Sequence, residues 1–209
     1  CIVTRSGGGA MTFAEAEERP FETIMSGPVA GAEGAGELAR RLDLGDAITA
    51  DVGGTSFDTC LVSGGRAQLM YEGEVEGLPV QTPWVDVRSI GAGGGSLATV
   101  DVGGLLRVGP GSAGAVPGPA CYGRGGTQPA VTDAAFVLGM LGKGVLASGI
   151  GLDRDRAEAA LAPLAGQLGF TTDEVARGIV TIAAANMANA IREITIERGR
   201  DPREARLMP

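Results

Sequence analysis

Glycine divides the chain between residues 47 and 77 into three short segments, and this constrains the fold more than any other feature. The segments are "AITADVGG", "SFDTCLVSGG" and "RAQLMYEGEVEG", and each ends at glycine after β-branched or alternating residues. Consecutive strands with tight glycine connections are typical of antiparallel pairing. The sequence therefore predicts a three-strand antiparallel meander here.

Helical patterns lie on both sides of the meander. Thr12 and Glu15 have capping-box spacing before a helix that Pro20 ends, and a small-residue helix follows from Ser26 towards Gly45. Three more helices are predicted, with Thr132, Asp153 and Thr171 as N-caps, and we expect Pro163 to bend or end the second of these. A strand is predicted at "EARLM". The fold class is mixed α/β, with α+β character.

The expected domain organisation has two parts. Residues 1–46 form an N-terminal segment with a linking helix, and residues 47–209 form the main domain, which contains an irregular glycine- and proline-rich region at 86–132. The chain begins at Cys1 and stops after "RLMP", so we expect a fragment that is truncated at both ends.

Composition excludes several kinds of chemistry. The 209 residues include no histidine, so the chain itself offers no Ser-His or Cys-His nucleophile pair. A net charge of −8 argues against nucleic-acid binding. Three dispersed cysteines without a CxxC pair suit a reducing cytoplasm, and no apolar run is long enough to span a membrane.

The residues "DVGGTSFD", from Asp51 to Asp58, are suited to a phosphate site. Adjacent glycines allow backbone N–H groups to approach an anion and allow positive φ, and Thr55 adds a hydroxyl. Asp51 and Asp58 flank the turn and are candidate Mg²⁺ ligands, because carboxylates beside a polyphosphate need a cation between them. The alternative is a simple Gly-Gly hairpin turn.

A second "DVGG", from Asp101 to Gly104, provides an internal comparison. Leu105 and Leu106 follow it where Thr55 and Ser56 follow the first copy, and no aspartate matches Asp58. We therefore interpret the second copy as a hairpin turn only.

The stretch "SIGAGGGS", from Ser89 to Ser96, is a second candidate site for a nucleotide or anion. Gly91, Gly93, Gly94 and Gly95 are expected to offer free amides, with a serine hydroxyl at each end. A flexible or bulged strand connection is the alternative.

Five stretches together resemble the hydantoinase A/5-oxoprolinase family of the actin-like ATPase superfamily. They follow the family's order and cover nearly the whole chain: "RPFETIMSGPVAGAEGA", "DVGGTSFD", "SIGAGGGSLATVD", "RVGPGSAGAVPGPACYGRGGTQPAVTDA" and "IREITIERGRDPREARLM". The resemblance implies an RNase H-like second lobe of a two-lobed ATPase that binds ATP and Mg²⁺. The first-lobe phosphate motif and the adenosine loop are absent from this sequence, so we expect the fragment alone to be inactive.

The resemblance also implies roles for individual residues. Asp51 would act in catalysis or position Mg²⁺, and Asp58 would support the metal or the loop. Gly53, Gly54, Thr55 and Ser56 would hold phosphate oxygens, together with the glycine tract.

The implied activity is an ATP-dependent hydrolase of cyclic amides such as hydantoin or 5-oxoproline, or a related carboxylase subunit. Phosphorylation of the amide oxygen would activate the ring for attack by water. The resemblance implies a hydantoinase B-like partner subunit, and we expect an oligomer. The alternatives are a non-catalytic actin-like nucleotide switch and a glycine-rich structural domain without a ligand.

The irregular loop after residue 116 contains further candidates for substrate contact: Cys121, Tyr122, Arg124 and Asp133. Arg124 suits a carboxylate or carbonyl group. Alternatively, Cys121 is a small buried thiol and Asp133 is merely the first-turn acid of the next helix.

Overall fold

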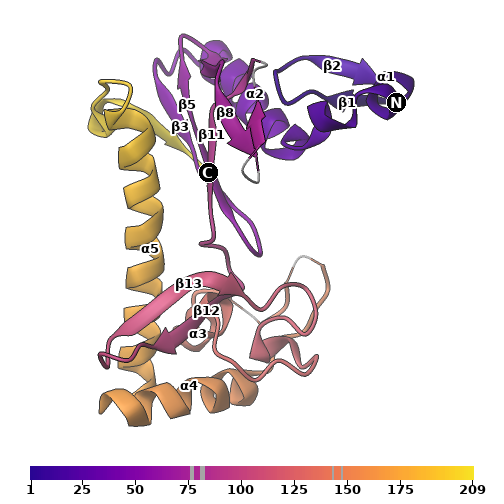
Figure 1. Cartoon of the computed structure of the whole chain (residues 1–209). Helices are drawn as coiled ribbons and strands as arrows, with labels where there is room; N and C mark the ends of the chain where they lie inside the picture. The colour runs from indigo at the N-terminus through magenta and orange to yellow at the C-terminus, as the bar shows by residue number, and fades with distance from the viewer. Residues whose placement is uncertain (76–77, 81–82, 143, 147) are drawn as a thin grey trace. The chain divides into compact units, whose positions relative to one another are not determined.

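The computed structural model describes residues 1–75, 78–80, 83–142, 144–146 and 148–209, and it shows a mixed α/β chain (Figure 1). The chain forms two compact units. The first unit comprises residues 1–51, 58–89 and 190–209, and the second comprises residues 52–57 and 90–189. This division does not follow the expected boundary at residue 46, because residues 1–46 pack in one unit with residues 58–89.

A six-stranded sheet forms the first unit's centre. Its main path runs β11 (Val87–Ile90), β5 (Phe57–Ser63), β3 (Ala47–Thr49) and β14 (Arg206–Met208), while β4 (Asp51–Val52) and β6 (Arg66–Ala67) also pair with β5. Strand β5 is antiparallel to both β3 and β6, which confirms the predicted meander. Strand β14 is parallel to β3 with Leu207 opposite Ile48, which confirms the strand predicted at "EARLM".

Helix α2 (Ser26–Arg41) packs on this sheet through its small residues. Gly36 is buried so close to the turn after β5 that a Cβ would lie 2.9 Å from the Gly65 carbonyl oxygen. Val29 and Ala32 join Cys60 and Val85 in one apolar cluster, and Ala39 joins Ala47 and Val62 in another. The predicted small-residue face therefore allows close approach of the helix to the sheet.

Shorter elements complete the first unit. Strands β1 (Ile2–Thr4) and β2 (Ala10–Thr12) form a hairpin before α1 (Phe13–Glu18) and the 3₁₀ turn η1 (Pro20–Thr23). Strand β7 (Leu69–Met70) pairs with β10 (Trp84–Val85), and β8 (Gly73–Val75) pairs with β9 (Leu78–Val80). The Thr12–Glu15 capping box is confirmed. The end of the third predicted segment, residues 76–77, lies outside the described residues.

The second unit combines a β-hairpin with helices. Strands β12 (Ser96–Val100) and β13 (Leu106–Ser112) are antiparallel, and the 3₁₀ turn η2 (Ala120–Tyr122) lies in the loop that follows. Helices α3 (Val131–Val137) and α4 (Arg154–Leu168) come next, followed by α5 (Thr172–Ile196), whose residues 172–189 belong to this unit.

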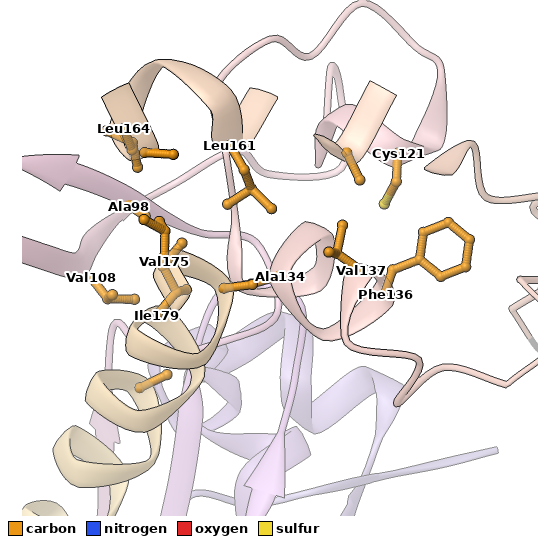
Figure 2. Close-up of a cluster of buried hydrophobic side chains, with 14 residues drawn as sticks. Ala98, Val108, Cys121, Ala134, Phe136, Val137, Leu161, Leu164, Val175 and Ile179 are labelled. Atoms are coloured by element: carbon orange, nitrogen blue, oxygen red, sulfur yellow. The ribbon is translucent and has the colours of Figure 1, made fainter. Parts of the chain in front are cut away.

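The core of the second unit lies between the hairpin and its helices, as Figure 2 shows. Ala98 and Val108 from the hairpin meet Leu161 of α4 and Ile179 of α5, all nearly or fully buried. The alternating pattern of the strands and the wide apolar arc of α5 thus converge on one core.

Two local details of the helices differ from expectation. Pro163 does not end helix α4, which continues to Leu168; both Pro163 and Ala159, whose carbonyl loses its usual hydrogen-bond donor, are exposed. The N-cap of α3 is Ala130 rather than Thr132, with Asp133 reaching back to the Ala130 amide. The predicted caps Asp153 and Thr171 are confirmed. Within the described part of the chain, no helix has the length and apolarity needed to cross a membrane.

Candidate functional site

The first "DVGG" forms a short exposed turn between β4 and β5. The Gly53 amide donates to the Ser56 carbonyl oxygen at 2.9 Å, and residues 53–55 are exposed. Neither Gly53 nor Gly54 has φ in the left-handed region, so the expectation that this turn uses positive φ is wrong. The reason for glycine here is therefore not a left-handed turn.

The glycine tract at 91–95 packs directly on this turn. The Gly94 amide donates to the Gly53 carbonyl oxygen at 3.0 Å, and the Gly95 amide donates to the Gly54 carbonyl oxygen at 2.6 Å. A Cβ on Gly93 would lie 2.6 Å from the Thr55 nitrogen and 2.7 Å from the Gly54 carbonyl carbon. Two backbone segments can approach this closely only where side chains are missing.

The amides of Gly93, Gly94 and Gly95 consequently donate their hydrogen bonds to acceptors within the protein. Gly93 donates to the Ser96 hydroxyl at 2.9 Å, while Gly94 and Gly95 donate to the turn. The expectation that these three glycines offer free amides to an anion is therefore corrected. Gly91 serves close packing as well, since a Cβ there would lie 2.9 Å from the Pro110 carbonyl oxygen.

The same contacts orient two amides of the turn away from the tract. The only cis peptides among the described residues precede Pro110 and Pro117, so the peptides of the turn are trans. In a trans peptide the carbonyl and the N–H point in opposite directions. Because the Gly53 and Gly54 carbonyls face the tract, the N–H groups of Gly54 and Thr55 face away from it.

These two successive amides form the chemically useful part of the turn. Among the residues that the structure describes, none accepts a hydrogen bond from the Gly54 or Thr55 N–H. A Cβ on Gly54 would meet nothing within 4 Å, so the space beside it is open. Adjacent exposed N–H groups can bind an oxyanion.

The first turn of α3 holds the tract in place. Both the amide and the hydroxyl of Thr132 donate to the Gly94 carbonyl oxygen, at 2.8 and 2.7 Å. Sequence reasoning missed this role of Thr132 because the contact depends on a fold that brings residues 94 and 132 together. The hydroxyl of Ser96, expected to face an anion, instead accepts from the tract.

Asp133 is fully buried and acts on the loop before it. Its carboxylate accepts backbone N–H bonds from Ala120 at 3.1 Å, Cys121 at 2.7 Å and Ala130 at 2.9 Å. With three backbone donors on its two oxygens, this carboxylate fixes the loop and the helix start. These contacts match the alternative of a first-turn acid and give it a larger structural role.

Cys121 lies beside Phe136 and Val137 in the core of the second unit (Figure 2). It is fully buried, and burial raises the pKa of its thiol well above the ordinary value, with the neighbouring Asp133 adding to the effect. A thiol in this environment is protonated and shielded from solvent. Arg124 is exposed and has no ion-pair partner within the described ranges. The structure brings Cys121 and Asp133 together and leaves Arg124 apart from their contacts.

Asp51 is exposed and Asp58 is half-buried, one directly before and one after the turn in the chain. No group of three or more acidic, cysteine or histidine side chains arranged to bind a metal occurs in the described part of the chain. A divalent cation here would therefore need ligands besides these two carboxylates, and Mg²⁺ commonly takes ligands from water and phosphate.

The second "DVGG" has a different structure, which confirms its interpretation as a hairpin turn. It joins β12 to β13, and Gly104 has a φ of +78°. The Asp101 carboxylate accepts from the amides of Gly103 at 2.9 Å and Leu105 at 3.0 Å and pairs with Arg107. The donors of this turn are thus occupied by its own aspartate.

Comparison with known proteins places the chain in a family. The model of the hydantoinase/oxoprolinase family matches residues 1–208. The alpha subunit of caprolactamase from Pseudomonas jessenii is 41% identical over 206 residues, which cover 98% of this chain and 30% of that subunit.

Two solved structures are similar as well. A nucleotide-free structure of acetone carboxylase, from work on ATP-dependent acetone carboxylation, has a TM-score of 0.84 at 28% identity and covers 98% of this chain. The ATP-dependent caprolactamase from Pseudomonas jessenii has a TM-score of 0.81 at 41% identity and covers 89%. The chain spans less than a third of each of these proteins: 29% of the carboxylase chain and 27% of the caprolactamase chain. With its glycine turn, its glycine tract and nearly all of its length matched, the chain belongs to the hydantoinase/oxoprolinase family.

Proposed function

We propose that this chain is the phosphate-binding part of an ATP-dependent enzyme that activates a small carbonyl compound. The reaction would be the hydrolysis of a cyclic amide or the related carboxylation of a ketone. The observation that carries the proposal is the outward orientation of the Gly54 and Thr55 amides beside open space. Two adjacent N–H groups, with the hydroxyl of Thr55, suit the oxygens of a transferring phosphoryl group.

Asp51 and Asp58 are the residues that would hold Mg²⁺ in this proposal. They flank the turn in the chain, and their two carboxylates fall short of a complete protein site. This number of ligands fits Mg²⁺, which usually binds one or two carboxylates together with phosphate oxygens. The cation would neutralise charge on the phosphates.

The chemistry of an amide explains why ATP is needed. An amide carbonyl is a poor electrophile, and its oxygen would attack the γ-phosphorus of ATP as the bond to the bridging oxygen breaks and ADP leaves. Water would add to the activated carbon, the ring C–N bond would break with a proton going to nitrogen, and a second water would release phosphate. The protein supplies position and charge stabilisation for these steps, which need no histidine.

The similarity to a subunit named alpha supports a further part of the proposal. We infer that the chain acts with a partner subunit of the hydantoinase B type, within an actin-like two-lobed ATPase. Substrate specificity would then depend on both proteins.

ATPase measurements on the full-length protein and its partner subunit test the proposal. We expect ATP hydrolysis to rise several-fold with ε-caprolactam, 5-oxoproline, hydantoin or acetone as the added compound. Gly54→Ala should abolish most of this activity, because the new methyl group meets no protein atom but occupies the space where phosphate would approach.

Gly166→Ala is the matched control. It lies on the exposed side of α4 and also meets nothing within 4 Å, so it should leave the ATPase unchanged. ATP hydrolysis that none of the four compounds stimulates would favour a nucleotide switch over an enzyme. Equal activity in the Gly54→Ala and Gly166→Ala variants would contradict the phosphate-binding role of the turn.

A further inference from the structure

A pocket of about 330 Å³ lies within the second unit, and none of its lining residues belongs to the turn. Its volume falls at the lower end of the range for small-molecule sites. The backbone of Ala113, Gly118, Gly125 and Gly126 forms much of its wall. The larger lining residues are Leu97, Ser112, Val116, Pro117, Thr127 and Gln128.

The side chains that line this pocket are all uncharged. Leu97, Val116 and Pro117 provide apolar surface for methylene or methyl groups. Thr127 and Gln128 provide a hydroxyl and an amide, which together can donate to a carbonyl and accept from an N–H. The Ser112 hydroxyl accepts from the Gly114 amide at 3.1 Å, so its own hydrogen can be directed to another acceptor.

Tight backbone packing gives the pocket its shape. A Cβ on Gly126 would lie 2.2 Å from the Gly118 carbonyl oxygen, and one on Gly118 would lie 2.8 Å from the Tyr122 ring. Tyr122 packs against the core of the unit, and the preceding residues Ala120 and Cys121 are held by Asp133. The loop is therefore anchored at the residues that form the pocket wall.

A single glycine connects the pocket wall to the proposed phosphate-binding turn. The Ala113 amide donates to the Gly95 carbonyl oxygen at 2.8 Å, and the Gly95 amide donates to the Gly54 carbonyl oxygen at 2.6 Å. A Cβ on Gly95 would lie 3.0 Å from the Ser112 hydroxyl oxygen and 2.8 Å from that same Gly54 oxygen. The pocket and the turn thus share one supporting segment.

We propose that this pocket binds a compact, uncharged carbonyl compound and discriminates against an analogue that carries a carboxylate. The identification of this compound as the one that is activated rests on the proposed function. An ionised carboxylate would find no cationic side chain among the lining residues to offset the water that it gives up on contact. Arg124 is in the same loop but does not line the pocket.

The test uses two probes that differ only by a carboxylate, 2-pyrrolidinone and 5-oxoproline. Each is titrated into the full-length protein without nucleotide, and the dissociation constant is measured by NMR. We expect 2-pyrrolidinone to bind about tenfold or more tightly than 5-oxoproline. Equal binding, tighter binding of 5-oxoproline or no binding of 2-pyrrolidinone would overturn the proposal.

Substitution of Gln128 locates the binding. Gln128→Arg places a cation at the pocket. It should weaken the binding of 2-pyrrolidinone and strengthen the binding of 5-oxoproline, so that the preference for 2-pyrrolidinone narrows or reverses. Gln167→Arg is the matched control, since Gln167 is also exposed and in the same unit but lies on α4 and does not line the pocket. Identical probe preferences in the two variants would show that the ligand binds elsewhere.

These measurements separate this inference from the proposed function. Binding of 2-pyrrolidinone is measured without ATP and does not depend on hydrolysis. If 2-pyrrolidinone fails to bind while Gly54→Ala still abolishes ATPase activity, the pocket assignment is wrong and the proposed function stands. If 2-pyrrolidinone binds with the predicted preference while Gly54→Ala hydrolyses ATP normally, the pocket assignment stands and the role of the turn is wrong.

Discussion

The Gly95 amide nitrogen lies 2.6 Å from the Gly54 carbonyl oxygen, and this hydrogen bond determines what the exposed turn can bind. Because the carbonyl faces the tract, the next amide in the chain, that of Thr55, must face the other way. In the same manner, the Gly94 amide donates to the Gly53 carbonyl oxygen, so the Gly54 N–H of that peptide also faces away from the tract. The glycine tract therefore contributes by orienting the donors of another segment.

Gly93→Ala should destabilise the protein by about 1–3 kcal/mol, because the added methyl group overlaps backbone atoms that have little room to move. The nearest atoms would be the Thr55 nitrogen, the Gly53 oxygen and the Gly54 carbonyl carbon, all within 2.7 Å. The free energy of unfolding from urea titration checks this prediction. Gly54→Ala is the control and should leave the unfolding free energy nearly unchanged, because its methyl group meets no atom within 4 Å. Equal stability of the two variants would contradict the packing described for the tract.

The sequence predicted the elements of the fold better than the contacts of the site. Strand β5 is a short segment bounded by glycines and helix α5 has a wide apolar arc, and both were predicted from these local features. The direction of the tract's amides was not predicted, because it depends on pairing between residues 53–54 and 94–95, which are distant in the chain. The same limit applies to Thr132, whose sequence position suggested a helix cap, whereas its partner is the Gly94 carbonyl.

The two "DVGG" copies offer a matched pair of aspartate substitutions. Asp51→Ala should abolish ATPase activity of the full-length protein and leave its melting temperature unchanged, because Asp51 is exposed and is proposed to bind Mg²⁺. Asp101→Ala should lower the melting temperature and leave ATPase activity unchanged, because Asp101 caps its own hairpin through Gly103 and Leu105. ATPase assays and thermal melts of both variants check the pair. The reverse assignment of effects would contradict the distinction between the two turns.

The pKa of Asp101 gives a pH-dependent prediction for the same hairpin. The Leu105 amide, followed by Arg107, lowers the pKa of this carboxyl below its ordinary value. A lowered pKa means that the carboxylate stabilises the folded hairpin above the unfolded value of about 3.9, and that this stabilisation is lost as pH falls through the lowered pKa. NMR titration of the Asp101 carboxyl carbon should give a midpoint below the unfolded value of about 3.9. A midpoint equal to or above about 3.9 would contradict this prediction.

The three cysteines should differ strongly in reactivity towards iodoacetamide. Cys1 is exposed, whereas Cys60 and Cys121 are buried. Burial raises the pKa of Cys60 to about 12 and raises the pKa of Cys121 as well, so neither thiol is ionised at neutral pH. Mass spectrometry of peptides after brief labelling at pH 8 should find Cys1 modified and the other two modified only after denaturation. Rapid labelling of folded Cys121 would contradict its place in the core.

Asp133→Ala should be among the more damaging single substitutions in the second unit. It removes the acceptor of three buried backbone N–H groups, those of Ala120, Cys121 and Ala130. Leaving such donors unpaired costs about 1–3 kcal/mol each, and the loop can relax to pair some of them with water, so we expect a loss of about 3 kcal/mol. Urea unfolding measures this loss.

Asp155→Ala separates this effect from the general preference for an acid at a helix start. Asp155 occupies the first turn of α4 but is exposed, so its removal should cost no more than about 0.5 kcal/mol. The loss of unfolding free energy in Asp133→Asn should fall between the losses in Asp155→Ala and Asp133→Ala. The amide oxygen of asparagine can still accept a hydrogen bond, whereas its NH₂ group would face a backbone donor. Since Asp133 anchors the pocket loop, Asp133→Asn should also weaken binding of 2-pyrrolidinone in protein that remains folded. Similar unfolding free energies for the Asp133→Ala and Asp155→Ala variants would show that the three buried contacts do not stabilise the loop.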